Sequence, residues 1–247
     1  MPELAIQTEN LTRTFGDFTA VDNITFEVKQ GEIFGFLGAN GAGKTTAMRM
    51  LTGLLTPSSG KALVSGKDVY TEAESIKKNI GYMSQKFSLY DDLTSEENIQ
   101  FYGGIYGIPD KELAKKIDEV IESVGLGDVR KKLVRSLPLG WKQKLAFSIS
   151  ILHNPKIVFL DEPTGGVDPV TRRQFWEKIY EVSDQGITVF VTTHYMDEAE
   201  YCDRISIMVD GRMDAIGTPK ELKENMNAES IEDVFIQLAR SAERGVG

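Results

Sequence analysis

Apolar and polar residues alternate in three segments near the start of the chain. Residues 4–7, 18–28 and 33–37 are rich in β-branched and aromatic residues, and Gly31 marks a turn between the last two. This pattern is typical of strands. A glycine-rich loop follows, and the residues from Lys44 to Leu51 are predicted to form a helix.

The middle of the chain changes to a helical period. Acidic residues at Ser95–Glu97 predict the start of one helix, and Pro109–Asp110 predicts the start of a second. Apolar residues of the second helix recur every three to four positions and so share one face. They are Leu113, Ile117, Val120, Ile121 and Val124. We expect a helical subdomain with its own buried face, over approximately residues 86–150.

Strands and helices alternate again in the remainder of the chain. Apolar strands are predicted at Ile157–Leu160 and Ile187–Thr192, with helices at Lys142–Leu152 and Pro169–Val182. Such alternation implies a parallel sheet with helices on both faces, into which the middle helices are inserted. The other strands expected are short: Ala62–Val64, Ile80–Met83 and Ile205–Val209.

Composition and charge limit the classes of protein to which the chain can belong. The 247 residues are 41% hydrophobic and 26% charged, which is ordinary for a globular protein. With 28 basic and 37 acidic residues, the net charge of −9 argues against binding to a nucleic-acid backbone. The single cysteine, Cys202, excludes an internal disulfide and is expected to be buried. No apolar run approaches the roughly 20 residues that span a bilayer, and the N-terminus does not look like a signal peptide.

The clearest chemical signal is the glycine-rich loop between the strand at 33–37 and the following helix. Two glycines separated by four residues are followed by Lys and Thr, a pattern typical of phosphate-binding loops. The loop reads Gly38-Ala39-Asn40-Gly41-Ala42-Gly43-Lys44-Thr45. Its glycines let successive N–H groups point at phosphate oxygens, Lys44 can reach the β- and γ-phosphates, and the Thr45 hydroxyl can bind Mg²⁺.

Two carboxylates follow the apolar strand at Ile157–Leu160. Asp161 and Glu162 stand at its carboxyl end, the edge of an α/β sheet at which ligands bind. Asp161 would hold Mg²⁺ directly or through water, and Glu162 could orient and polarise an attacking water. Together with the phosphate loop, the pair is a strong indication of a site at which water attacks a γ-phosphate.

These motifs and three further matches resemble the nucleotide-binding subunits of ABC transporters. The further matches are Gln85 in the segment Gly81–Gln85, Gly166–Asp168 after Glu162, and His194 in Thr192–His194. The resemblance covers roughly residues 4–240. It implies an α/β P-loop NTPase fold: a mainly parallel central sheet flanked by helices, an N-terminal antiparallel β subdomain and an inserted α-helical subdomain. We expect a single domain over residues 1–240 and a tail over 241–247.

The resemblance also implies roles for residues outside the two motifs. Phe15 would stack on adenine, and Thr46 would join the phosphate loop in binding ATP. Gln85 would contact Mg²⁺ and water, and would link the site to a membrane subunit. His194 would contact the γ-phosphate, and Asp168 would communicate across a dimer of ATPase subunits.

The signature motif, which in the family binds ATP of the partner subunit in trans, departs from the usual Leu-Ser-Gly-Gly-Gln. Here the aligned residues run from Leu137 through Pro138, Leu139 and Gly140 to Trp141. Pro138 offers neither a hydroxyl nor a backbone N–H, and Leu139 replaces a glycine. Gly140 and the start of the next helix remain as anion-binding elements. We expect ATP binding at the phosphate loop to survive, while the strength of dimerisation and the turnover rate stay open.

Two stretches are similar to ATPases of the bacterial type-2 exporter class: Leu89–Asn98, and Ser230–Ile236 near the C-terminus. The second predicts an amphipathic helix with Ile231, Val234, Phe235 and Leu238 on one face. The expected function is ATP hydrolysis that powers export through a separate membrane permease. The expected partners are that permease and a second ATPase subunit, identical or different, with no nucleic acid. The chain would lie at the cytoplasmic face of the cell membrane through the permease.

Three alternatives compete with this interpretation. A non-transport ABC ATPase acting on ribosomes or DNA usually has two cassettes or a long coiled coil, and neither is found here. A regulatory subunit that binds ATP with little turnover would follow if the altered signature abolished hydrolysis. An importer ATPase is disfavoured by the exporter-like stretches. The exported substrate stays open, because its contacts would lie in the permease.

Overall fold

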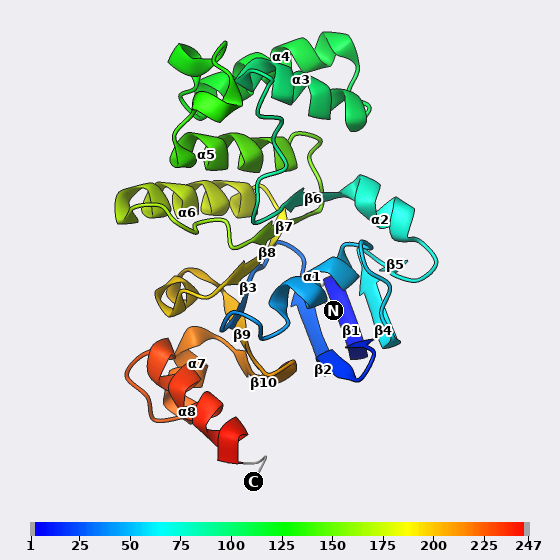
Figure 1. Cartoon of the computed structure of the whole chain (residues 1–247), viewed down its shortest axis with the longest axis vertical. Coiled ribbons are helices and arrows are strands. Elements are labelled where there is room, and N and C mark those ends of the chain that lie inside the picture. Colours follow the sequence, from blue (N-terminus) through cyan, green and yellow to red (C-terminus); the bar gives the residue numbers. More distant parts are fainter. Residues whose placement is uncertain (1–2, 245–247) are drawn as a thin grey trace.

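A six-stranded sheet forms the centre of the molecule (Figure 1). The computed structural model describes residues 3–244, and side chains as far as residue 241. The strands are β10 (Arg212–Gly217), β9 (Arg204–Val209), β3 (Ile33–Gly38), β8 (Thr188–Thr193), β7 (Ile157–Asp161) and β6 (Ile80–Met83), in that spatial order. Neighbours run parallel except β9 and β10, which are antiparallel. The mainly parallel sheet expected from the sequence is confirmed.

An antiparallel sheet of N-terminal strands packs beside the central one. Its order is β2 (Phe18–Lys29), β1 (Leu4–Phe15), β4 (Ser59–Val64) and β5 (Lys67–Asp68). The strand predicted at residues 4–7 therefore continues to Phe15. Pairing with β2 on one side and β4 on the other holds residues 8–15 extended, although their own polarity pattern does not favour a strand.

Apolar layers cover both faces of the central sheet. Phe34 and Phe36 of β3 face the antiparallel sheet and helix α1 (Lys44–Leu51), whereas Leu37 faces the opposite layer. This alternation follows from the two-residue period of a strand. The opposite layer contains α6, the 3₁₀ segment η3, α7 and α8, which span Pro169–Asp184, Met196–Tyr201, Pro219–Asn225 and Ile231–Arg244.

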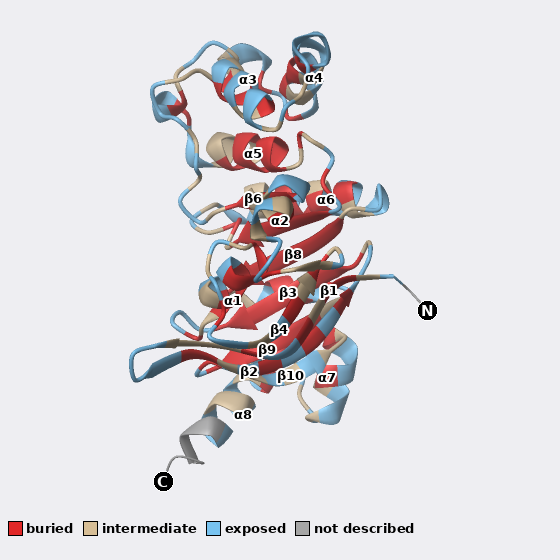
Figure 2. Ribbon diagram, turned by 90° about the vertical axis from the view of Figure 1, so that its right-hand side faces the viewer, coloured by how far each residue is buried: buried red, intermediate tan, exposed pale blue. Residues whose placement is uncertain are grey.

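Three helices form a separate apolar cluster at the end of the molecule opposite α7 and α8 (Figures 1 and 2). They are α3 (Ser95–Ile105), α4 (Asp110–Ser123) and α5 (Leu139–Ser150). The predicted start of α3 is confirmed by reciprocal hydrogen bonds between Thr94 and Glu97, a capping box. The predicted stripe on the second helix is buried except for Val120, which is half-buried. The inserted helical subdomain of the fold is thus present.

Several element bounds differ from those expected. Helix α5 begins at Leu139 rather than Lys142, so the altered signature forms its first turn. Helices α2 (Ala73–Asn79) and α7, and strands β5 and β10, were not predicted.

Cys202 is buried, as expected. None of the helices within residues 3–244 combines the length and the hydropathy that a membrane-spanning helix requires.

The C-terminal helix α8 has the predicted amphipathic pattern. Ile231 and Val234 are buried, and Phe235 and Leu238 are half-buried against the same layer. The helix runs to Arg244, past the boundary expected at residue 240. Residues 245–247 of the expected tail lie outside the described residues.

Candidate functional site

The phosphate loop leads from β3 into α1 and requires glycine where its backbone turns. Gly43 has a φ of +101°, and a Cβ there would lie 2.3 Å from the Ala20 carbonyl oxygen. The next residue, Lys44, is buried, and its Nζ donates to the carbonyls of Gly38 at 2.8 Å and Ala39 at 3.0 Å. Burial lowers the pKa of Lys44, against the opposing effect of the nearby Glu162 carboxylate. The amine is therefore held in place but poorly solvated, ready for an anion.

Asp161 ends β7 and points its carboxylate toward α1. Its Oδ1 accepts hydrogen bonds from Thr192 Oγ1 at 2.7 Å and from Thr45 Oγ1 at 3.3 Å. Burial raises the pKa of Asp161, and these hydrogen bonds oppose the rise. The paired carboxylate and hydroxyl oxygens fit Mg²⁺, which prefers hard oxygen ligands.

The carboxyl group of Glu162 is the point on which side chains from three elements converge. Gln85 Nε2 donates to its Oε2 at 2.9 Å, and His194 Nδ1 lies 3.1 Å from the same oxygen. Lys44 Nζ lies 3.6 Å from Oε1. The residue adopts a left-handed backbone with a φ of +48°, a conformation rare outside glycine. Such strain is retained where the surrounding structure holds it, often at functional sites.

A cavity of about 350 Å³ opens over the phosphate loop and contains most of the predicted ATP-binding residues. It is lined by Phe18, Ala20, Asn40, Gly41, Gly43, Lys44, Thr45, Thr46, Gln85 and Glu162. Phe18 was not predicted. It is 64% exposed at the start of β2, and the sequence alone does not distinguish it from Phe15 on the other side of the same turn.

Phe15 does not line this cavity, although the resemblance implies that it stacks on adenine. Phe15 is 47% exposed, and the guanidinium carbon of Arg13 lies 4.5 Å from the centroid of its ring. Arg13 is itself held by a hydrogen bond to the Thr56 carbonyl at 2.7 Å. The stacking role of Phe15 stays a prediction.

The altered signature lies outside the cavity of its own chain. Pro138 is the N-cap of α5, and Leu139 is 41% exposed. A Cβ on Gly140 would lie 3.0 Å from Thr171 Cγ2, so the start of α5 packs closely on α6. No acidic side chain occupies the first turn of α5, and the positive end of the helix is left uncompensated by its own residues.

Asp168 caps the start of α6. Its carboxylate accepts from the backbone N–H groups of Val170 and Thr171, both at 3.0 Å, and from Thr171 Oγ1 at 2.6 Å. The bonds to Thr171 lead the effects that lower the pKa of Asp168. The residue therefore has a role within its own chain, and communication across a dimer stays a prediction.

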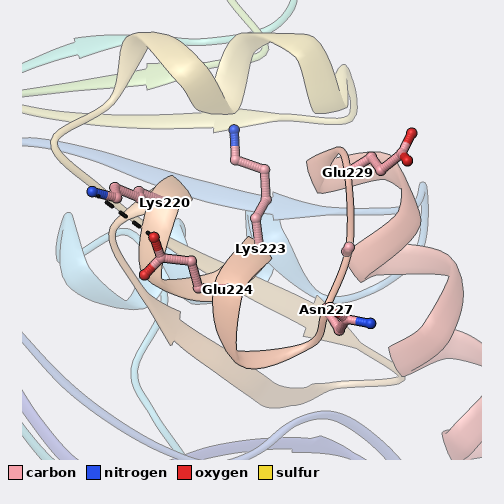
Figure 3. Close-up of a pocket in the computed structure, with 6 residues that line it drawn as sticks. Lys220, Lys223, Glu224, Asn227 and Glu229 are labelled. Atoms are coloured by element: carbon pink, nitrogen blue, oxygen red, sulfur yellow. Dashed lines mark ion pairs between the residues drawn. The ribbon is translucent and has the colours of Figure 1, made fainter.

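A second hollow lies between α7 and the start of α8 (Figure 3). Lys220 in this hollow pairs with Glu224 at 3.8 Å, and Lys223 pairs with Glu200. These charges are compensated within the chain. The hollow shares no residue with the phosphate-loop cavity, and it does not contribute to the candidate site.

Comparison with known proteins decides the family. The sequence pattern of the family described as "ABC transporter" matches residues 21–165, more than half of the chain. The chain belongs to the ABC transporter family. It is 38% identical over 227 residues to the linearmycin resistance ATP-binding protein LnrL of Bacillus subtilis, covering 92% of the chain and 73% of that protein.

Longer relatives contain a cassette of this kind as one part. The chain is 49% identical over 241 residues to the probable multidrug ABC transporter ATP-binding protein YbhF of Escherichia coli, which covers 96% of the chain. It spans only 42% of that relative's length. Among solved structures, cbiO1 of Clostridium perfringens, described as part of the ABC transporter complex cbiONQ, has a TM-score of 0.82 and 28% identity, covering 91% of the chain and 92% of cbiO1. The chain is an ABC ATP-binding cassette with the P-loop NTPase fold.

Proposed function

We propose that this cassette binds and hydrolyses ATP to power export through a separate membrane permease. The observation that carries the proposal is the position of the Glu162 carboxyl group beside the phosphate loop, within reach of Lys44, Gln85 and His194. Export is favoured over import because the relatives YbhF and LnrL are named for multidrug transport and for linearmycin resistance.

Each of these side chains has a distinct role in the proposed reaction. When ATP binds, its phosphate oxygens replace the carbonyls of Gly38 and Ala39 as hydrogen-bond acceptors of the Lys44 ammonium. Lys44 and His194 then stabilise charge that develops on the γ-phosphoryl group. Glu162 orients a water for in-line attack and accepts its proton. Gln85, which donates to Glu162, keeps that carboxylate aimed at the water.

Mg²⁺ is the proposed cofactor beside ATP. Asp161 and Thr45 would hold it, with Gln85 as a further oxygen donor. The described residues contain no group of three His, Cys, Asp or Glu side chains able to bind a metal, and in this proposal ATP would bring the ion to the site. When bound, the ion neutralises charge on the β- and γ-phosphates.

Two cassettes face each other head to tail in this proposal. Each ATP lies between Gly38–Thr45 of one copy and residues 138–141 of the other, with Asp168 near the contact. Closure and opening of the dimer move the permease, which docks on the helical subdomain near residues 87–90. The cassette domain, residues 1–240, is thereby held at the cytoplasmic face of the membrane. Nucleic acid has no part in this cycle.

The test combines activity with partner identification. Purified protein should show Mg²⁺-dependent ATP hydrolysis, and a tagged chain purified gently in detergent from its native membranes should retain a polytopic membrane protein, identified by mass spectrometry. A second cassette in the same complex would show that the dimer is heteromeric. Recovery with ribosomes, DNA or soluble proteins alone would refute the transport role.

A further inference from the structure

Glu198 is a fully buried acidic residue that the proposed mechanism does not use. It lies in η3, four residues after His194, and its side chain is 0% exposed. Its Oε1 accepts a hydrogen bond from Thr164 Oγ1 at 2.5 Å, and Arg172 Nε lies 3.6 Å from the same oxygen. Burial of a carboxyl group opposite a guanidinium is costly in desolvation. The role of Glu198 and Arg172 follows from the two segments of the chain that they contact.

On one side, Glu198 holds the loop that follows Glu162. Thr164 is itself buried, and the neighbouring Gly165 N–H donates to the Glu162 carbonyl at 3.2 Å. The Gly165 carbonyl accepts a hydrogen bond at 3.3 Å from Gln143, a buried residue of α5. The loop at residues 163–167 is thus fixed between Glu198 and the helix that begins with the signature.

On the other side, Arg172 holds the residue that follows His194. Its guanidinium carbon lies 4.2 Å from the centroid of the Tyr195 ring, and its Nη1 lies 3.1 Å from Asp197 Oδ2. The ring of Tyr195 is in turn 4.2 Å from that of His194, centroid to centroid. The pair therefore contacts the chain on both sides of the site, at Thr164, two residues after Glu162, and at Tyr195, which follows His194.

The pair is incompletely bonded in this arrangement. Of the side-chain atoms that the structure describes, Arg172 Nε and Glu198 Oε2 are both buried without a hydrogen-bond partner. The 3.6 Å separation of Arg172 Nε from Glu198 Oε1 exceeds normal hydrogen-bond length. Arg172 Nε can therefore move closer to the Glu198 carboxylate without breaking a hydrogen bond, because neither Arg172 Nε nor Glu198 Oε2 makes one.

We propose that Glu198 and Arg172 form a positioning unit that fixes the loop at 163–167 relative to His194, so that Glu162 and His194 both face the γ-phosphate at the same time. This inference rests on the proposed hydrolysis of ATP at Glu162. Neither residue touches the nucleotide. Loss of the unit lowers the rate of the chemical step and leaves ATP binding at the phosphate loop unchanged.

Glu198→Gln is the first test, because glutamine keeps the volume and an acceptor for Thr164 while removing the charge that faces Arg172. We expect kcat for ATP hydrolysis to fall about tenfold, with KM and the equilibrium affinity for ATP within about twofold of the parent. Glu32→Gln is the matched control. Glu32 is 6% exposed and pairs with Arg204 at 3.1 Å, but it precedes β3 at the sheet edge opposite the phosphate loop. The substitution Glu32→Gln should lower thermal stability and leave kcat unchanged.

A second pair of variants covers the case in which Glu198→Gln does not fold. Thr164→Ser retains the hydroxyl and should keep the parent kcat. Thr164→Val has a similar volume without the hydroxyl, and it should lower kcat with no change in KM. The proposal is overturned if Glu198→Gln or Thr164→Val turns over at the parent rate, or if Glu32→Gln lowers kcat equally. Absence of Mg²⁺-dependent hydrolysis by the parent protein would instead overturn the proposed function.

Discussion

The two surfaces proposed to enclose ATP differ in how much polar chemistry they provide. On the phosphate-loop side, Lys44, Asp161 and Glu162 are charged groups held by hydrogen bonds or close charge partners. On the signature side, Pro138 and Leu139 bring no polar side chain. In the proposed reaction, one chain would therefore supply the side chains that bind and cleave ATP, whereas the partner chain would contribute backbone groups.

The start of α5 is nevertheless well formed. Pro138 is the N-cap of α5, where a missing N–H costs no intrahelical hydrogen bond, and Gly140 lets the helix pack against Thr171. The positive end of the helix, with no acidic residue in its first turn, still attracts phosphate. We therefore expect an ATP-dependent dimer that is weaker than one with the usual signature but is not inactive.

The largest effect on ATP binding is expected for Lys44→Ala. Loss of a charge-assisted contact should weaken ATP binding about 10- to 100-fold, and hydrolysis should fall by at least a similar factor. Titration with a fluorescent ATP analogue measures the affinity. Lys142→Ala, which removes a lysine on the signature side paired with Asp91, should leave the affinity of the isolated cassette unchanged. Equal losses in both variants would contradict the division between the two surfaces.

Gly43→Ala should destabilise the cassette more than Gly41→Ala. Both glycines have positive φ, which costs another residue about 1–3 kcal/mol. A Cβ at 43 would also lie 2.3 Å from the Ala20 carbonyl, whereas nothing lies within 4 Å of a Cβ at 41. Thermal unfolding of the two variants without nucleotide measures the difference, and equal melting temperatures would show that the loop yields at Gly43.

Restoring the usual signature should have a moderate effect confined to the dimer. In the double variant Pro138→Ser with Leu139→Gly, a serine hydroxyl could donate to the γ-phosphate, which is worth about tenfold in the ATP-dependent dimerisation constant. Sedimentation velocity with and without Mg²⁺-ATP measures this constant. The affinity of the monomer for ATP should not change. Unaltered dimerisation would mean that residues 138 and 139 do not face the nucleotide.

The smallest expected effect is the uptake of part of a proton by Lys44 when ATP binds. Burial lowers the pKa of Lys44 below 10.5, so in the free cassette the amine begins to lose its proton at a lower pH than an exposed lysine. ATP phosphates favour the charged amine and raise its pKa again. Binding at alkaline pH below 10.5 should therefore take up a fraction of a proton, more as pH rises. Calorimetry in buffers of different ionisation enthalpy measures this uptake, and heats that do not depend on the buffer would contradict it.

Much of the fold could be predicted because its strands are apolar and its motifs are local. Helix α1 and strand β6 have the predicted bounds. The start of α5 was missed because proline and glycine rarely favour a helix, and packing on Thr171 decides it. Helix α7 was missed although Thr218 and Glu221 form a capping box, a signal that was present in the sequence.

Some residues of the candidate site could also be predicted from the sequence, and others could not. Asp161 and Glu162 were predictable because carboxyl ends of parallel strands meet at one edge of a sheet. Phe18 was not, since Phe15 and Phe18 flank one turn and only its geometry decides which ring lines the cavity. Glu198 was not predictable either, because it stands in an acidic stretch that reads as exposed, and tertiary contacts with Thr164 bury it.

In the proposed reaction, the side chains that cleave ATP all lie in one chain, and Glu162 acts on the attacking water. The most direct test is Glu162→Gln, measured for ATP affinity, hydrolysis and oligomeric state in the same preparation. We predict that ATP affinity stays close to that of the parent, that hydrolysis falls by at least about 100-fold, and that Mg²⁺-ATP traps a closed dimer. Hydrolysis at the parent rate would contradict the assignment of Glu162 and, with it, the account of this site.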